Sequence, residues 1–96
     1  MSNVYYDPKE FGLTVIAELS EDESYEFDMT VVWQHEDGTI YWDHDSGCSC
    51  PTPFENVRGI SDLYVLATSI EELRQTVERQ RVSLEDRIAF LQQVKA

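Results

Sequence analysis

The chain has 96 residues, 42% of them hydrophobic, and its nineteen acids outnumber seven Lys and Arg to give a formal net charge of -12. This length supports one domain, residues 1–96, with a single core that needs no cross-links. The negative charge disfavours direct binding to nucleic acid, and no apolar run approaches the ~20 residues that a membrane span needs.

The N-terminal half, about residues 5–57, predicts an acidic antiparallel β-meander. Apolar and polar residues alternate from Phe11 to Ser20 and again from Tyr25 to Gln34, which is the period of half-buried strands. Asp37-Gly38 is a strong signal for a hairpin, and a two-residue turn there places Trp33 opposite Trp42 on the core face. The opposite, solvated face then carries four acids, and an acidic link joins the first two strands: Glu18, Glu26, Asp28 and Asp43, with Glu21, Asp22 and Glu23 in the link.

The C-terminal part, about residues 69–95, predicts helix. Ser69-Ile70-Glu71-Glu72 and Ser83-Leu84-Glu85-Asp86 resemble two capping boxes, which favours two helices. Apolar residues at seven-residue spacing from Ile70 to Leu91 would also fit one continuous helix, so residues 70–95 stay open between one helix and two. Residues 62–67 fit either a short fourth strand or a helical turn.

Together these elements predict an α+β fold with three or four antiparallel strands, followed by one or two C-terminal helices packed on one sheet face. We expect the helices to cover the face that carries the large apolar side chains of the second and third strands, which are Phe27, Met29, Val31, Trp33 and Trp42.

A loop after the third strand concentrates the unusual residues of the chain. Asp45 and Gly47 fit a turn in which the aspartate accepts backbone N–H bonds and the glycine takes a positive φ. Pro51 and Pro53 would keep the next residues extended, and Phe54 would insert into the core. In this interpretation the loop is structural, and its two cysteines, Cys48 and Cys50, are reduced and half-buried.

The same loop supports an alternative prediction, a metal-binding or thiol-redox module. His44, Asp45, Cys48 and Cys50 offer an imidazole, a carboxylate and two thiolates to zinc. Structural zinc sites usually take two separated pairs of ligands, and this chain has a single Cys-x-Cys. We therefore predict no bound metal and no cofactor. No catalytic residues are assigned, because nothing in the sequence supplies a nucleophile together with a base and an oxyanion hole.

The segment from Tyr25 to Trp33, the Asp37-Gly38 turn and the run Asp45-Ser46-Gly47-Cys48-Ser49-Cys50-Pro51-x-Pro53-Phe54-Glu55 resemble a family of small proteins encoded by phages of actinobacteria. The resemblance covers roughly residues 5–63. It implies a phage accessory protein made in the host cytosol, and it brings no known activity, catalytic residue or ligand residue.

The acidic excess indicates the kind of partner. Residues 1–57 hold thirteen acids and one base, whereas residues 58–96 hold six of each. We expect a non-enzymatic interaction module that binds a host or phage protein, with a basic surface as the natural complement. A minor alternative is an acidic inhibitor that mimics DNA, and the C-terminal helices offer a route to a homo-oligomer. The N-terminus lacks the basic and apolar regions of a signal peptide, which predicts a cytosolic protein.

Overall fold

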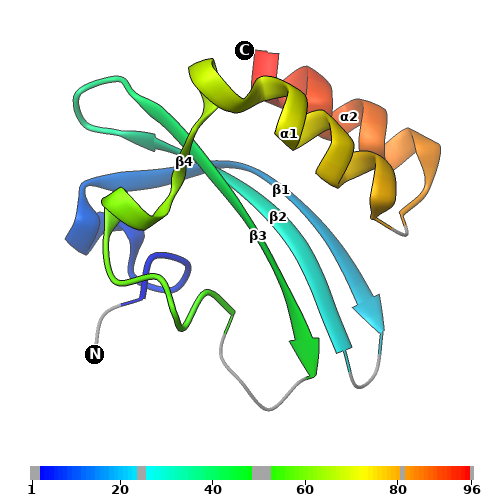
Figure 1. Ribbon diagram of the computed structural model, residues 1–96, viewed down its shortest axis with the longest axis horizontal. Helices are drawn as coiled ribbons and strands as arrows, with labels where there is room; N and C mark the ends of the chain where they lie inside the picture. Colours follow the sequence, from blue (N-terminus) through cyan, green and yellow to red (C-terminus); the bar gives the residue numbers. More distant parts are fainter. Residues whose placement is uncertain (1–2, 24–25, 49–52, 81, 96) are drawn as a thin grey trace.

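The computed structural model describes residues 3–23, 26–48, 53–80 and 82–95. It has the predicted α+β architecture, a four-stranded antiparallel sheet in the order β1-β2-β3-β4 followed by two helices (Figure 1). The strands are β1 (Leu13–Glu23), β2 (Glu26–His35), β3 (Ile40–Cys48) and β4 (Tyr64–Val65). The helices are α1 (Leu66–Arg79) and α2 (Leu84–Lys95), and two 3-10 turns, η1 (Pro8–Phe11) and η2 (Ile60–Asp62), precede β1 and β4.

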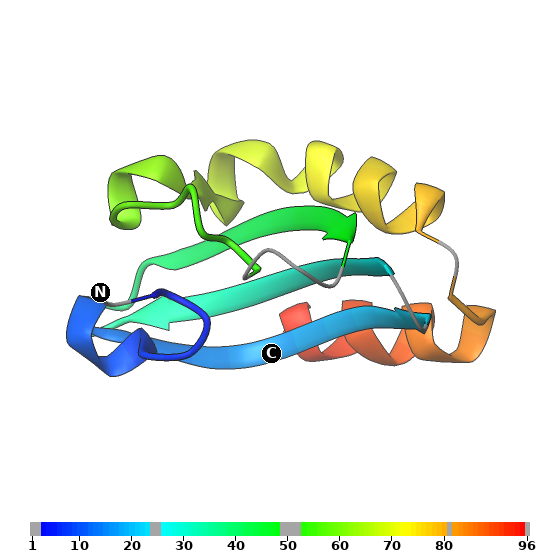
Figure 2. The ribbon, with the colours of Figure 1, turned by 90° about the horizontal axis from the view of Figure 1, so that it is seen from below.

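Both faces of the sheet are covered (Figure 2). One face, here called the helix face, packs against α1 and α2, with a core of Ala17, Leu19, Val32, Trp42, Leu73, Val77, Phe90 and Val94. The other, here called the loop face, packs against the N-terminal segment and the segment before β4, with a core of Val4, Leu13, Met29, Val31, Trp33, Phe54 and Leu63. The sheet is thus the middle layer of three.

The β2–β3 hairpin has a three-residue turn, so the register predicted from a two-residue turn is wrong. The His35 N–H donates to the Thr39 carbonyl at 2.8 Å, and Gly38 takes the left-handed conformation with a φ of 93°. The Asp37 carboxylate accepts the Thr39 N–H at 2.9 Å. This is the type I turn followed by a left-handed residue that is common in three-residue hairpins.

The longer turn shifts the pairing by one residue, which reverses the faces of one strand relative to the other. Trp33 pairs with Tyr41, and Val32 pairs with Trp42. Trp33 therefore lies on the loop face and Trp42 on the helix face, and the predicted cross-strand tryptophan pair does not form. Each indole N–H finds its own acceptor, the Val4 carbonyl for Trp33 at 3.1 Å and the Ser69 hydroxyl for Trp42 at 2.8 Å.

The unbroken alternation predicted for the first strand is also wrong, because β1 contains a β-bulge. Val15 pairs with Trp33 and Ala17 with Val32, which leaves Ile16 as the extra residue. The bulge moves Leu13 onto the loop face, whereas Ala17 and Leu19 belong to the helix face. The strand can thereby contribute apolar side chains to both cores.

The side chains expected beneath the helices are divided between the two faces. Of the five, only Trp42 lies on the helix face, beside Val32. The other four, Phe27, Met29, Val31 and Trp33, belong to the loop face, which the N-terminal segment and Phe54 cover. The sequence-based assignment failed because it treated the sheet as one-sided. With both faces buried, the apolar alternation of β2 does not identify which face meets the helices.

The C-terminal part forms two separate helices, and the second begins as predicted. The Ser83 hydroxyl accepts the Asp86 N–H at 3.1 Å, as an N-cap does. Ser69 differs: it marks a kink inside α1, with φ -138° and ψ 27°, and its hydroxyl donates to the Val65 carbonyl at 2.6 Å. Residues 62–67, left open by the sequence, contain two strand residues and then the start of α1. Within the described residues, neither helix is long and apolar enough to cross a membrane.

Candidate functional site

The predicted turn at Asp45-Ser46-Gly47 is not a turn, because β3 continues to Cys48. Ser46 pairs with Asp28 and Gly47 with Phe27 on β2. Strand β2 offers ladder partners along this whole length, and these bonds outweigh the local turn preference. Three members of the predicted loop set lie outside the described residues: Cys50, Pro51 and the side chain of Cys48. The states of the two thiols therefore stay predictions.

Asp45 anchors the returning chain. Its carboxylate accepts the Phe54 N–H at 2.7 Å and the Ser46 N–H at 2.9 Å. Phe54 takes a left-handed φ of 61°, and its ring is 2% exposed, with its centroid 5.4 Å from that of Trp33 in an edge-to-face contact. The Pro53 carbonyl accepts the Asn3 side-chain amide at 3.0 Å. The aspartate thus helps to position an aromatic ring that fills the loop-face core.

The proposed zinc ligands His44 and Asp45 lie on opposite faces. His44 pairs with Thr30, and its Nε2 lies 2.5 Å from a carboxylate oxygen of Asp28. Asp45 reaches Phe54 on the loop face. Neighbouring residues of a strand point in opposite directions, so these two side chains do not converge on one ion. No group of three or more His, Cys, Asp and Glu side chains suited to a metal occurs in the described part of the chain. The described part does not include the sulfur atom of either cysteine.

Three of the four acids predicted on one solvated face have described side chains, and these three are divided between the two faces, which corrects that prediction. Glu18 and Asp43 both align with Val31 of the loop face, whereas Asp28 bonds His44 on the side of Thr30. The bulge in β1 and the three-residue hairpin turn cause this division. The side chains of Glu21, Asp22, Glu23 and Glu26 lie outside the described residues. Whether any of these acids binds a partner stays a prediction.

Glu18 is the most accessible of the three described acids. Its carboxylate accepts the Tyr5 O–H. The pKa of Tyr5 is raised to about 12, mainly because the phenol is partly buried and secondly because it donates this hydrogen bond. Asp43 is more enclosed. Burial raises its pKa to about 6, with a further contribution from Asp45, while a hydrogen bond from the His44 N–H partly offsets the effect.

The raised pKa of Asp43 predicts a pH-dependent cost to folding. The folded state holds this proton up to about pH 6, whereas the unfolded chain releases it near the ordinary value of 3.8, so stability falls as pH rises through this interval. The full interval corresponds to a ceiling of ~3 kcal/mol, and the partial exposure of the group reduces the expected cost to ~1 kcal/mol.

We therefore expect Asp43→Asn to increase the free energy of unfolding at pH 7.5 and to leave it unchanged near pH 3.5, as measured by urea denaturation. Asp37→Asn is the control with the opposite sign, because backbone and side-chain bonds from Thr39 lower the pKa of Asp37. Losing the Asp37 carboxylate should therefore lower the free energy of unfolding at neutral pH. Equal effects of Asp43→Asn at both pH values would contradict the assignment.

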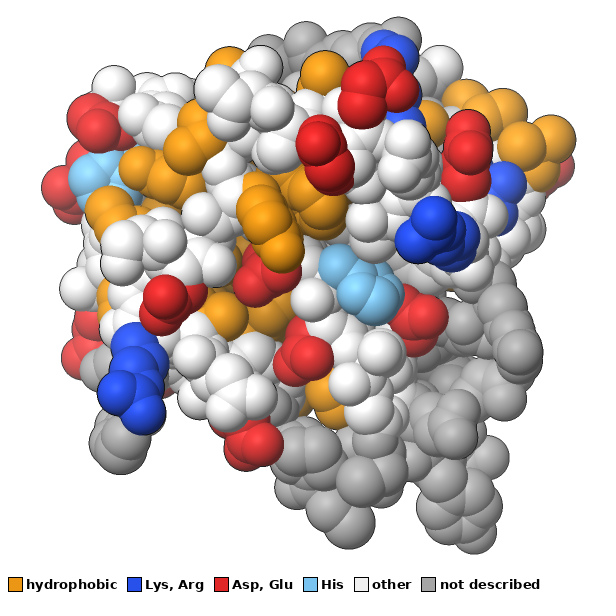
Figure 3. Space-filling model, in the orientation of Figure 1, with side chains coloured by type: hydrophobic (Ala, Val, Ile, Leu, Met, Phe, Trp, Pro, Cys, Tyr) orange, Lys and Arg blue, Asp and Glu red, His pale blue; other side chains and the backbone are white. Residues whose placement is uncertain are grey.

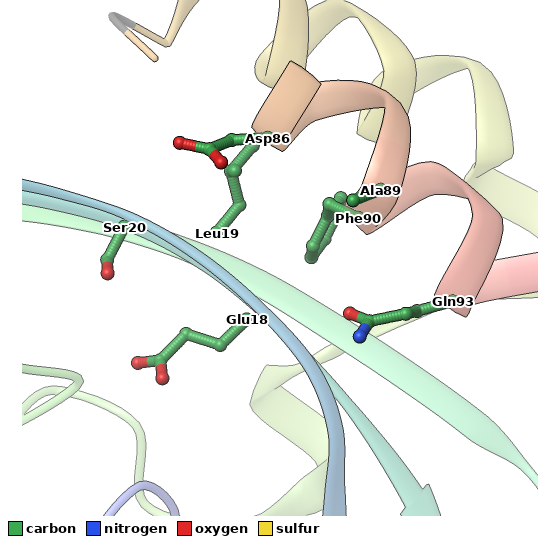
Figure 4. Close-up of a pocket in the computed structure, with 7 residues that line it drawn as sticks. All are labelled: Glu18, Leu19, Ser20, Asp86, Ala89, Phe90 and Gln93. Carbon is green, nitrogen blue, oxygen red and sulfur yellow. The ribbon is translucent and has the colours of Figure 1, made fainter. Parts of the chain in front are cut away.

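A shallow groove of about 240 Å³ lies between the outer side of β1 and helix α2 (Figure 4). Leu19 points toward α2, whereas Glu18 and Ser20 point to the other side of the strand. Across from them α2 contributes Asp86, Ala89, Phe90 and Gln93. The groove therefore borders β1 on both sides of its backbone, and its two charged residues, Glu18 and Asp86, are both acids.

A family model described as a domain of unknown function (DUF7574) matches residues 2–94. The chain belongs to this family. No curated protein and no solved structure matches it. The family match extends through both helices, beyond the part of the chain, roughly residues 5–63, that carries the resemblance to actinobacterial phage proteins. The sheet and the helices thus form one family unit, and α2 with its side of the groove is part of it.

Sequence reasoning missed the α2 side of the groove. In the sequence, Asp86 is only part of a capping pattern, and Gln93 belongs to no motif. Neither has a local signal, because their position opposite Glu18 depends on the packing of α2 against β1.

Proposed function

We propose that the chain is a non-enzymatic protein-interaction module. Its acidic part, residues 1–57, here called the sheet half, would bind a partner with a basic surface. One observation carries the proposal. Among the described side chains of residues 3–48, with Glu10 set aside, no carboxylate forms an ion pair with lysine or arginine. In Figure 3 acids are spread over the visible face, and basic side chains are few. This charge attracts a basic partner and repels nucleic acid.

The resemblance to proteins of actinobacterial phages supports a narrower proposal. The chain would be a phage accessory protein that acts in the host cytosol on a host or phage protein. A small acidic module whose sheet is packed on both faces suits such a role, since it offers a preformed surface to a partner.

Mimicry of DNA has less support from the geometry. B-DNA presents one charge per ~1.7 Å of axis, so a mimic needs a dense row of acids on one side. The described acids of the sheet instead divide between its two faces, with Glu18 on the loop face and Asp28 beside His44.

An affinity experiment with matched charge variants tests the proposal. Tagged protein would be incubated with an actinobacterial lysate at about 0.05 M and about 0.5 M salt, and captured proteins identified by mass spectrometry. We expect a specific partner with a basic surface, lost at high salt. The test variant neutralises three exposed acids of the sheet half and its loops (Glu18→Gln, Glu36→Gln and Glu55→Gln).

The control neutralises three exposed acids of the helices (Glu72→Gln, Glu78→Gln and Glu85→Gln), which changes the net charge equally. The first variant should lose the partner and the second should keep it. Equal capture by both variants would contradict the proposal. A native mass that includes zinc would instead promote the metal-module alternative.

A further inference from the structure

Strand β1 is an open edge of the sheet. Among the residues that the structure describes, it has a strand neighbour, β2, on one side only. Beyond the bulge at Ile16, the residues from Ala17 to Glu23 stay in unbroken register with β2, and they contain no proline, glycine or lysine. Natural edge strands are usually protected by charged residues, proline, bulges or shortness. Here the bulge interrupts only the first part of the strand, and the residues beyond it are protected by acids, which repel an acidic strand but not a basic one.

An edge of this kind presents backbone hydrogen-bonding groups. Alternate residues of an antiparallel strand direct their N–H and C=O groups away from the paired neighbour. Seven residues span ~23 Å, which is enough for an added strand of six or seven residues. The groove between β1 and α2 lies along the same strand, so side chains of an added strand would meet Glu18 on one side and Asp86 on the other.

We propose that β1 binds an extended basic segment of the partner as a fifth strand. The inference rests on the proposed function and names its binding site. Backbone hydrogen bonds to β1 would supply the affinity, and the acids beside the strand would select arginine or lysine at alternate positions, whose side chains point to the same side.

The charge of β1 also argues against pairing with a second copy of the chain. The strand contains four acids and no base: Glu18, Glu21, Asp22 and Glu23. Two antiparallel copies of β1 would bring these acids together, and like charges on paired strands are destabilising. A basic strand has the opposite sign of interaction at every one of these positions.

A synthetic peptide tests the site directly. The probe is acetyl-(Arg-Thr)4-amide, and the charge control replaces each arginine with glutamate. By NMR at low salt, we expect the arginine peptide to shift the amide signals of residues 17–23 and to slow their hydrogen exchange. The glutamate peptide should have no effect.

Two N-methylated forms of the peptide, one methylated at every arginine and one at every threonine, keep the charge but remove alternate N–H donors. An added strand uses only one of these two rows, so one form should bind at least about tenfold more weakly than the other. Equal binding by both forms would show that only charge holds the peptide, and would overturn the inference.

A charge-matched pair of variants locates the site on the protein. Glu18→Gln with Asp86→Lys keeps the acceptor for Tyr5 and should weaken binding about tenfold or more. Glu36→Gln with Glu78→Lys changes the net charge equally at exposed positions away from the groove and should weaken it less than about threefold. Thermal melts would check that each variant is folded.

The outcomes separate this inference from the proposed function. Binding with amide shifts elsewhere on the sheet would overturn the β1 site and leave the basic-partner proposal standing. Suppose instead that capture from lysate depends on the acids of the sheet half but the peptide does not bind. That outcome would likewise overturn the β1 site and leave the basic-partner proposal standing. A dimer of the free protein with protected β1 amides, measured by sedimentation and hydrogen exchange, would show that a second copy occupies the edge and would also overturn the inference.

Discussion

Replacing Phe54 with alanine is expected to lower the free energy of unfolding by about 3 to 4 kcal/mol, as measured by urea denaturation. The ring is 2% exposed and packs against Trp33 and Tyr5, with centroid distances of 5.4 and 6.1 Å. Alanine would leave a cavity beneath the loop face, and the left-handed backbone of residue 54 would remain strained. No compensating gain is available in the folded state.

Two further variants make this result specific. Phe54→Leu keeps most of the volume and should cost less than about 1.5 kcal/mol. Leu84→Ala removes a side chain that is 65% exposed and should change stability by less than about 0.5 kcal/mol. A neutral effect of Phe54→Ala would mean that the ring does not support the core, and Phe54 would then become a candidate contact for the partner.

The position of Phe54 was predictable because its signals are local. Two prolines precede it, and a large aromatic residue in a polar loop has few places to go other than the core. The route to that position was not predictable. Asp45 accepts the Phe54 N–H from a strand residue, at a separation of nine positions, and no short motif encodes such a bond.

The register of the hairpin could not be predicted from the local sequence pattern. Asp37-Gly38 correctly identifies the turn, yet the same dipeptide serves turns of two and three residues. The choice depends on the ladder beyond the turn, and a difference of one residue moves Trp42 to the other face. Since both faces of this sheet are buried, hydrophobicity could not correct the error.

Helix caps show the same contrast. Ser83 caps α2 because its partner, the Asp86 N–H, is three residues away. Ser69 has an equally good local pattern, but its hydroxyl bonds the Trp42 indole and the Val65 carbonyl. Tertiary partners replaced the local one, and the same kind of long-range contact places Asp86 beside Glu18 in the groove.

Gln80, which sequence reasoning passed over, has the second large expected effect. Gln80→Ala should lower the free energy of unfolding by about 2 to 4 kcal/mol. Its side chain is 2% exposed; the amide oxygen accepts the Thr30 hydroxyl at 2.8 Å, and the amide nitrogen donates to the carbonyls of Leu19 and Asp28 at 2.7 and 3.0 Å. Alanine leaves these buried groups without their partner. Gln75→Ala, at an exposed position of α1, is the matched control and should be nearly neutral.

The contacts of Gln80 also connect the stability of the fold to the groove. Its backbone carbonyl accepts a guanidinium N–H of Arg87 at 3.1 Å, so one residue ties α2 to β1 and β2. Gln80→Ala should therefore speed hydrogen exchange in α2 more than in β3. Combined with Thr30→Val, it should show a coupling energy of about 0.5 to 3 kcal/mol, since the two side chains share a buried bond. Additive effects, with uniform exchange across α2 and β3, would mean that α2 is held over β1 by the apolar core alone, with Phe90 and Val94 as its anchors.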